Sequence, residues 1–205
     1  MISFETEQTD DLNFVEELCW KLLAYGASNR KSPMRNVVIG SAVDGKAYMQ
    51  TVTLRRVEVA ERKVFFHTDI RSEKIKVIAQ SGHLSWLAHD SENRSQVRLY
   101  GKTVIHHRDA LCAERWKNTK HPSRRAYLLP EGPGVKIEGS EPYTNPYFEN
   151  FDYTDEESEA GFENFVVVET TVEWMDWYYT HSKGNRRASF EYEKGVLKTA
   201  GWLYS

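Results

Sequence analysis

The stretch from Ala47 to Lys102 constrains the fold more than any other part of the chain. It begins with AYMQTVTLRRVEV, which is rich in β-branched residues and alternates along most of its length. Tyr48 and Gln50 therefore share one face of a predicted strand and Met49 the other. The later runs KVFFHTD, HLSWLAHD and SQVRLYGK also have the composition of strands. Four short strand-like runs in succession predict a β-sheet.

A two-residue turn at Asp44-Gly45 predicts the first hairpin of this sheet, because Asp-Gly between alternating strands favours a tight turn. The strand before it is expected over Val37–Val43 and the strand after it over Lys46–Val59. A further strand is expected over Val64–Phe66, ended by His67-Thr68-Asp69. Two hairpins in succession form an antiparallel meander.

Helices are predicted on both sides of the first strands. Asp10 or Asp11 is expected to cap a helix that runs to about Tyr25 and ends at Gly26. This helix and the polar connector after it make up an N-terminal region, residues 1–33. Further along, Ser72 is positioned to cap a short helix over Glu73–Gln80.

The second half of the chain continues the mixture of strands and helices. We expect Gly101–His107 to prolong a strand, and Arg108-Asp109-Ala110 to open a helix. A second short helix is expected near Ser123–Leu129. Phe165–Tyr179 is interpreted as a strand pair or one long bent strand. The last predicted hairpin pairs Arg186–Glu193 with Gly195–Trp202.

Residues 139–163 differ in character from the rest of the chain. The segment is acidic, and its aromatic residues follow no period; they are Tyr143, Tyr147, Phe148, Phe151 and Tyr153. We interpret it as an acidic aromatic loop insertion. The whole chain, residues 1–205, is then a single mostly β domain with flanking helices, of the small barrel or sandwich type.

Composition excludes several classes of function. A formal net charge of −3 gives no general attraction for nucleic acid. No apolar run has the length of a membrane span, and the first residues do not resemble a signal peptide. Cys19 and Cys112 have no pairing or metal spacing, which favours a reducing, cytoplasmic setting. The histidines also lack ligand partners at metal spacing, so no metal site is predicted.

Three cations on regular elements define a candidate anion site. They are Arg55, Lys74 and Arg98, accompanied by several hydroxyl groups and by the helix start at Ser72. From this pattern alone, ordinary solvated strand and helix faces are the better explanation. No nucleophile motif or Gly-rich phosphate loop accompanies them in the sequence.

Three blocks, taken in order, favour a more specific interpretation. QTVTLRRV, FFHTDIRSEK and SQVRLYG resemble the signature blocks of the pyridoxamine 5′-phosphate oxidase-like FMN-binding proteins. The resemblance covers about residues 37–107, with a weaker similarity around Trp177 and Arg186–Phe190. It implies an antiparallel split β-barrel and a homodimer that holds FMN at its interface.

The resemblance also implies a set of cofactor-binding residues. The first block lies along the flavin, and the residues concerned are Gln50, Thr51, Val52, Thr53, Leu54 and Arg55. The second block supplies His67 and Thr68 to the ring or ribityl chain, and Ser72 and Lys74 to the phosphate. Gln96, Trp177 and Arg187 complete the set, and Arg55 also reaches the phosphate. Packing in the core explains Trp177 equally well.

Departures from the family pattern concern the substrate. The first-block arginine is Gln50 here, and Glu73 replaces a basic residue. Lys183-Gly184-Asn185 stands where the oxidases have R-L-H, and Arg124 and Arg125 are candidates for a substitute substrate contact. We therefore expect an FMN-dependent oxidoreductase with an unassigned small-molecule substrate. The alternatives are a non-catalytic flavin-binding or flavin-buffering protein, a true pyridoxamine 5′-phosphate oxidase with a substitute clamp, and a small-ligand barrel without flavin.

Overall fold

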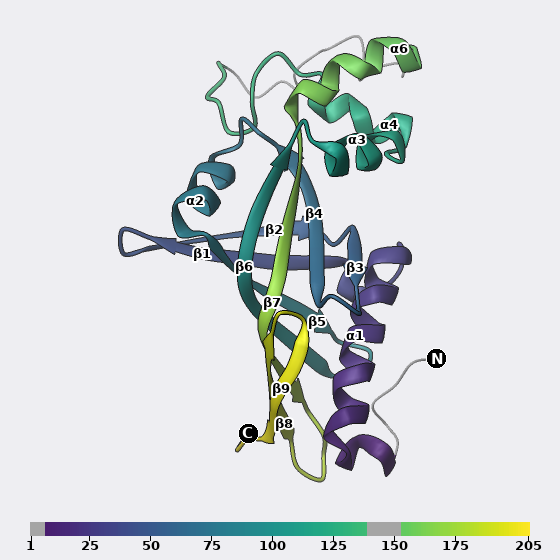
Figure 1. Cartoon of the computed structure of the whole chain (residues 1–205), viewed down its shortest axis with the longest axis vertical. Coiled ribbons are helices and arrows are strands. Elements are labelled where there is room, and N and C mark those ends of the chain that lie inside the picture. The colour runs from purple at the N-terminus through teal and green to yellow at the C-terminus, as the bar shows by residue number, and fades with distance from the viewer. Residues whose placement is uncertain (1–6, 139–152) are drawn as a thin grey trace. The chain divides into compact units, whose positions relative to one another are not determined.

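The structure, a computed structural model, describes residues 7–138 and 153–205 (Figure 1). Most of the aromatic residues predicted to lie in the acidic insertion fall outside the described residues. The chain divides into two compact units, which we call the larger and the smaller unit. The larger comprises Met1–Phe66, Val77–Val104 and Glu169–Ser205, and the smaller comprises His67–Lys76 and Ile105–Val168. The prediction of one domain remains a prediction.

Nine strands are found among the described residues. They are β1 (Asn36–Val43), β2 (Lys46–Thr53), β3 (Arg56–Glu58), β4 (Lys63–Asp69), β5 (His83–Asp90), β6 (Ser95–His107), β7 (Phe165–Tyr179), β8 (Arg186–Glu193) and β9 (Val196–Trp202). They form one sheet in the order β2-β1-β5-β6-β7-β4-β3, with β8 paired to β7 and β9 paired to β8. The pairs β1–β2, β1–β5, β3–β4, β5–β6, β7–β8 and β8–β9 are antiparallel. The predicted class, mostly β with flanking helices, is confirmed.

The helical elements flank these strands. The α-helices are α1 (Leu12–Ser28), α2 (Glu73–Ser81), α3 (Ala110–Lys117), α4 (His121–Arg124) and α6 (Asp155–Ser158). The 3₁₀ turns are η1 (Glu7–Asp10), η2 (Pro33–Arg35), η3 (Arg125–Tyr127) and η4 (Glu159–Asn164). In the larger unit α1 packs beside β3, and in the smaller unit α4 contacts α6 (Figure 1).

The hairpin predicted at Asp44-Gly45 is present. Both residues have positive φ, 50° for Asp44 and 74° for Gly45, as the favoured two-residue turn requires. Pairing of β1 with β2 runs from Asn36 opposite Thr53 to Val43 opposite Lys46. The hairpin therefore holds the predicted flavin-facing residues of β2 in a fixed register.

The strand predicted over 46–59 is interrupted in the structure. Leu54 is only 1 % exposed, and its N–H donates to the carbonyl of Arg35 at 2.8 Å. The N–H of Arg55 donates to Phe65 O at 2.8 Å, so the chain changes partner from β1 to β4 at this point. The break follows from that exchange of partners. The β4 strand also differs from expectation, because it continues through the predicted stop at 67–69.

The first helix begins as predicted and ends later. The Asp11 carboxylate accepts the N–H of Asn13 at 2.8 Å and so caps α1. The predicted end at Gly26 is wrong, because α1 continues to Ser28. Gly26 serves a different purpose: a Cβ atom there would lie 2.7 Å from Met34 O. Glycine permits the close approach of η2 to the helix.

A buried polar cluster ties α1 to the sheet of the larger unit. The Glu16 side chain is 5 % exposed and accepts from Arg62 Nη2 at 3.1 Å and from Tyr192 Oη at 2.8 Å. Trp20 Nε1 donates to the same Tyr192 oxygen at 3.0 Å. The Arg62 guanidinium lies 5.2 Å from the Trp20 ring centroid and 5.5 Å from that of Tyr192. Three parts of the chain that are distant in sequence thus meet in this cluster, where Arg62 neutralises the charge of Glu16.

The smaller unit contains more helix than the sequence suggested. The predicted start of α3 is confirmed, because Asp109 caps it through the N–H of Cys112 at 2.9 Å. The second short helix begins two residues early, as α4 followed by η3. The expected loop is wrong for residues 155–163, which lie in α6 and η4. Thr154 and Glu157 form a capping box there, which explains the helical turn.

Gly26→Ala tests the close approach of α1 and η2. Alanine favours a helix over glycine by about 1 kcal/mol, but the clash with Met34 O opposes this gain, and overpacking costs about 1–3 kcal/mol. We expect a lower denaturant midpoint by circular dichroism. Gly201→Ala is the matched control, since a Cβ there meets no atom within 4 Å. Equal stability of the two variants would contradict the packing argument.

Candidate functional site

The predicted flavin-facing segment lies on β2 and just after it. Gln50 and Thr51 are exposed, and Val52 and Thr53 are half-buried. Leu54 differs, because its side chain lies in the core and only its main chain can contact a ligand. The segment thus offers polar side chains up to the point where the chain leaves β1.

A group of arginines gathers around the end of β2. Arg55 is exposed, and its positive charge, together with that of Arg30, lowers the pKa of Arg35 after the larger effect of burial. The Arg35 guanidinium donates to Ala27 O at 3.1 Å, which fixes its position. This part of the larger unit is therefore electropositive. Arg55 was predicted from the sequence and Arg35 was not, although this arginine stands two residues before a predicted strand.

The smaller unit contains a compact cluster of two hydroxyls and one ammonium group. Lys74 Nζ donates to Ser72 Oγ at 2.7 Å and to Thr68 Oγ1 at 3.2 Å. Ser72 is buried and directly precedes α2, whose first turns carry the lysine. All three groups were predicted as phosphate or flavin contacts, and the structure brings them together. A terminal phosphate fits this donor set, because each group can supply an N–H or O–H donor to an anionic oxygen.

The ammonium group of this cluster is partly desolvated. Burial lowers the pKa of Lys74, and the negative charge of Asp69 opposes that shift in part. A cation placed where water solvates it poorly gains more from an incoming anion than a fully solvated one. The cluster therefore favours the binding of a negatively charged ligand.

A neighbouring ion pair shapes the turn that carries these hydroxyls. Arg71 binds Asp69 through Nε at 3.0 Å and Nη2 at 2.7 Å, and this hydrogen bonding raises the pKa of Arg71. Arg71 Nη1 also donates to the carbonyls of Leu129 and Pro130 at 2.8 and 3.0 Å. Arg71 is fully engaged in holding the turn and does not add a free cation to the cluster.

His67 lies on β4 in the smaller unit, and Gln96 lies on β6 in the larger unit. The His67 ring is half-buried and packs edge-on to Phe165 at 4.9 Å. Gln96 lies on β6 opposite His89, on the same strand face as Arg98. Both residues retain partly exposed side chains, as ligand contacts require.

Arg187 belongs to a charged triad in the larger unit. Its Nε donates to Asp176 Oδ2 at 2.8 Å, while Arg98 donates to Asp176 Oδ1 through Nε at 3.2 Å and Nη2 at 3.0 Å. The Asp176 side chain is 1 % exposed. The sequence analysis did not single out Asp176, yet a carboxylate inside the apolar run EWMDWYY is a recognisable sign of a buried ion pair.

A cavity of about 370 Å³ opens on the sheet of the larger unit beside this triad. Its lining is mostly apolar and includes Met49, Leu87, Tyr100 and Trp174, with Arg98 as a charged member. These residues come from β2, β5, β6 and β7. Arg98 and Tyr100 lie on the face of β6 that is less buried, opposite the face that carries Val97.

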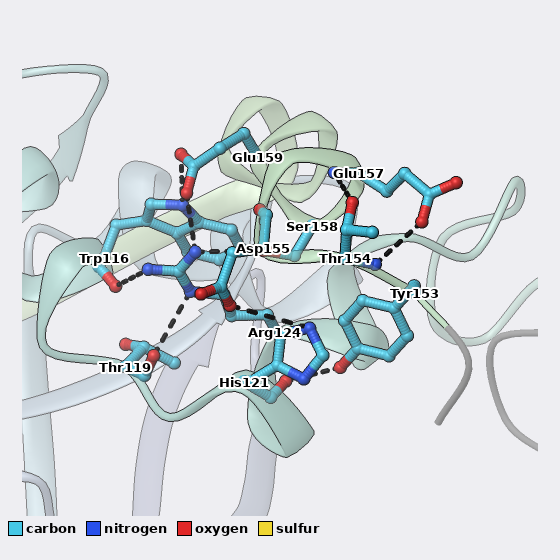
Figure 2. Close-up of polar contacts among 10 residues, drawn as sticks. All are labelled: Trp116, Thr119, His121, Arg124, Tyr153, Thr154, Asp155, Glu157, Ser158 and Glu159. Atoms are coloured by element: carbon cyan, nitrogen blue, oxygen red, sulfur yellow. Dashed lines mark hydrogen bonds and ion pairs between the residues drawn. The ribbon is translucent and has the colours of Figure 1, made fainter. Parts of the chain in front are cut away.

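Arg124 lies at the centre of a cluster in the smaller unit, shown in Figure 2. Its guanidinium donates to Trp116 O, Thr119 O, Ser158 Oγ and Glu159 Oε1 at 2.6–3.2 Å. It also lies 4.7 Å from the Trp116 ring centroid. These contacts join α3 and α4 to α6 and η4. These donors of Arg124 are used within the protein, and its substrate role stays a prediction.

The two cysteines do not have the environment of a reactive thiol. Burial raises the pKa of both the Cys19 and Cys112 thiols, which disfavours a reactive thiolate. Within residues 7–138 and 153–205, no group of three or more His, Cys, Asp or Glu side chains is placed to hold a metal ion.

In the same ranges, no helix is long and apolar enough to span a membrane.

A comparison with protein families gives a match over the blocks that carry these residues. Residues 19–107 match the model of the pyridoxamine 5′-phosphate oxidase FMN-binding domain. This segment, less than half of the chain, is similar to that domain. FMN is the cofactor that the match assigns. A comparison with curated protein sequences finds no match.

Solved structures show the same fold. A pyridoxamine 5′-phosphate oxidase-related FMN-binding protein from Nostoc punctiforme has a TM-score of 0.70 at 15 % identity, covering 92 % of this chain and 96 % of that chain. PhzG from Burkholderia lata, in complex with tetrahydrophenazine-1-carboxylic acid, has a TM-score of 0.68 at 16 % identity, covering 98 % and 97 %. At these identities the similarity establishes the split-barrel fold alone.

Trp177 differs from what the resemblance to the FMN-binding proteins implies. Its side chain is fully buried and stacks on Tyr179 at 5.8 Å, with Trp202 edge-on at 6.4 Å. A ring in this position packs in the core of the larger unit, so the core explanation of Trp177 is the one that the structure supports. Arg125, in contrast to Arg124, keeps a half-buried side chain at the start of η3.

Proposed function

We propose that this chain is an FMN-dependent oxidoreductase whose substrate is not a vitamin-B6 phosphate. The observation that carries the proposal is the Thr68, Ser72 and Lys74 cluster, whose donors suit a terminal phosphate. Arg55 is proposed as a second phosphate contact, in keeping with its position in the family pattern and its exposed side chain. Bound FMN would supply the electron transfer, while the protein binds and orients it.

The remaining site residues have supporting roles in this proposal. Gln50, Thr51, Val52 and Thr53 line the flavin from β2, and Leu54 contributes its main chain. His67 contacts the ring or ribityl chain. From a second copy of the chain, Gln96 and Arg187 reach the ring. Both side chains are partly exposed in the structure, which is compatible with contacts across an interface.

The proposed second copy docks on the outer face of the sheet of the larger unit. Three large apolar side chains on this face are exposed: Met49 by 67 %, Tyr100 by 41 % and Val104 by 46 %. They lie on β2 and β6, and Met49 and Tyr100 also line the 370 Å³ cavity. A symmetric dimer contact would cover apolar surface that is otherwise left in water.

The substrate assignment depends on the turn between β7 and β8. Gly184 has a φ of 123°, and its N–H donates to His181 O at 3.0 Å. Asn185 Oδ1 accepts the N–H of His181 at 3.3 Å, so this side chain is engaged within the turn. Lys183-Gly184-Asn185 itself supplies neither the arginine fork nor the imidazole of the R-L-H pattern that it replaces. This supports a substrate other than pyridoxamine 5′-phosphate.

The first prediction concerns cofactor choice. The protein should bind FMN more tightly than riboflavin, and Lys74→Met or Arg55→Ala should weaken FMN binding by about one to two decades, because each removes a charge-assisted contact. Riboflavin affinity should be unaffected by either change. Lys76→Met, an exposed lysine on the same helix, is the matched control. Fluorescence titration measures the affinities, and equal binding of FMN and riboflavin by the wild type would refute the phosphate site.

The lowered pKa of Lys74 gives this prediction a pH dependence. Deprotonation removes the positive charge, so FMN affinity should fall as pH rises, and the fall should begin below the ordinary lysine value of about 10.4. Bound phosphate favours the charged form and raises the pKa again. The same titration in Lys74→Met should lack this alkaline loss. An identical pH profile in both proteins would remove Lys74 from the phosphate site.

A second prediction concerns the dimer. Met49→Glu places a charge on the apolar face and should shift the protein from dimer to monomer in light scattering, with loss of FMN, because the site needs both copies. Val196→Glu is the control, since Val196 is 59 % exposed on β9. A monomeric Met49→Glu protein that keeps its FMN would rule out the shared site.

A third prediction concerns turnover. FMN-loaded protein should oxidise pyridoxamine 5′-phosphate in air far more slowly than about 1 s⁻¹, the low end of common enzyme rates. Assays of pyridoxal 5′-phosphate and peroxide measure this. Faster turnover would instead favour an oxidase with a substitute clamp, and its loss in Arg125→Ala would locate that clamp. Slow flavin reoxidation with every acceptor tested, after reduction by NAD(P)H, would favour a non-catalytic flavin-binding protein.

A further inference from the structure

Asp176 is a buried carboxylate shared by two arginines. It lies on β7, and its side chain is 1 % exposed. Each of its oxygens serves a different arginine: Oδ1 accepts from Arg98 on β6, and Oδ2 accepts from Arg187 on β8. The carboxylate therefore links the strands on either side of β7 through side chains.

The charges of this triad do not cancel. Two guanidinium groups face one carboxylate, which leaves one positive charge in excess. A buried carboxylate is costly unless it is paired, and two arginine partners satisfy both of its oxygens. The excess charge is carried by the arginines, whose side chains are 40 % exposed for Arg98 and 33 % exposed for Arg187.

The hydrogen bonds to Asp176 determine which edge of each guanidinium group faces away from the carboxylate. Arg187 uses only Nε toward Asp176, so its two terminal nitrogens are not engaged by that carboxylate. Arg98 uses Nε and Nη2, and its guanidinium lies 5.4 Å from the ring centroid of Trp174. Binding through the inner edge presents the outer edge of each planar group to the surface.

We propose that Asp176 is a positioning residue that holds the terminal nitrogens of Arg187 in the orientation in which they contact the flavin. The inference rests on the proposed FMN function, and it adds a residue that acts through Arg187 without contacting the cofactor. Because a planar fork loses less freedom on binding when it is already oriented, fixing Arg187 should tighten FMN binding.

A merely structural role of Asp176 predicts a different result. A buried ion pair that only stabilises the fold would change the denaturant midpoint and leave the affinity for FMN in the folded protein unaltered. A positioning role requires that Asp176 and Arg187 act as one unit on affinity. A double-mutant cycle separates the two, because residues that act together give non-additive effects.

The experiment measures FMN affinity by fluorescence titration for wild type, Asp176→Asn, Arg187→Ala and the double variant. We expect Arg187→Ala to weaken binding about tenfold or more, the scale of a charge-assisted contact. Asp176→Asn should cost a similar factor, and the double variant should be no weaker than Arg187→Ala alone. Glu173→Gln is the matched control for loss of charge, since Glu173 lies on the same strand with a side chain 47 % exposed.

Arg187→Lys tests the same inference without altering the buried carboxylate. Lysine keeps the charge but lacks the planar fork, so its FMN affinity should fall to the level of Arg187→Ala. The positioning role would be overturned if Arg187→Lys bound FMN as tightly as the wild type. Additive losses of FMN affinity in the double variant would overturn it as well. Neither result would contradict FMN binding itself. Wild-type protein that binds no FMN would overturn the proposed function and this inference together.

Discussion

The larger unit depends on the neutralisation of one buried carboxylate, that of Glu16. Helix α1 would gain most from an apolar residue at this inward-facing position, yet it carries an acid there. The acid is tolerated because Arg62 and the Tyr192 hydroxyl both donate to it. The same contacts fix the helix against the turn before β4 and against β8. Burial and the negative charge of Glu16 raise the pKa of Tyr192, so the hydroxyl stays a neutral donor over the accessible pH range.

Asp176 repeats the same principle on the other side of the sheet. In each case a buried carboxylate is matched by arginine from a neighbouring strand or turn, and the links to Arg62 and Arg98 join segments far apart in the chain. The two sites differ in charge balance. Glu16 meets one arginine, which also packs between two aromatic rings, whereas Asp176 meets two and leaves positive charge near the surface. The first arrangement joins α1 to the sheet, and the second joins β7 to β6 and β8.

The sequence predicted those features that depend on local chemistry. The Asp44-Gly45 turn, the Asp11 and Asp109 caps and the last hairpin follow from a few adjacent residues. Lys74 was also visible, because the helix start that carries it is local. The burial of Leu54, Trp177 and Arg124 was not visible in the sequence, since each owes it to segments distant in the chain, although a core position had been considered for Trp177. A family pattern places a residue along a strand, but it does not say which side chain turns inward where strands exchange partners.

The burial of both thiols has a practical consequence. Cys19 is fully buried in α1, and Cys112 is fully buried behind the cap of α3. Burial raises the pKa of each thiol, which disfavours the thiolate that maleimide and iodoacetamide reagents require. We therefore expect little reaction of Cys19 and Cys112 with such reagents in the folded chain. A cysteine introduced at a chosen surface position would carry a spectroscopic label alone.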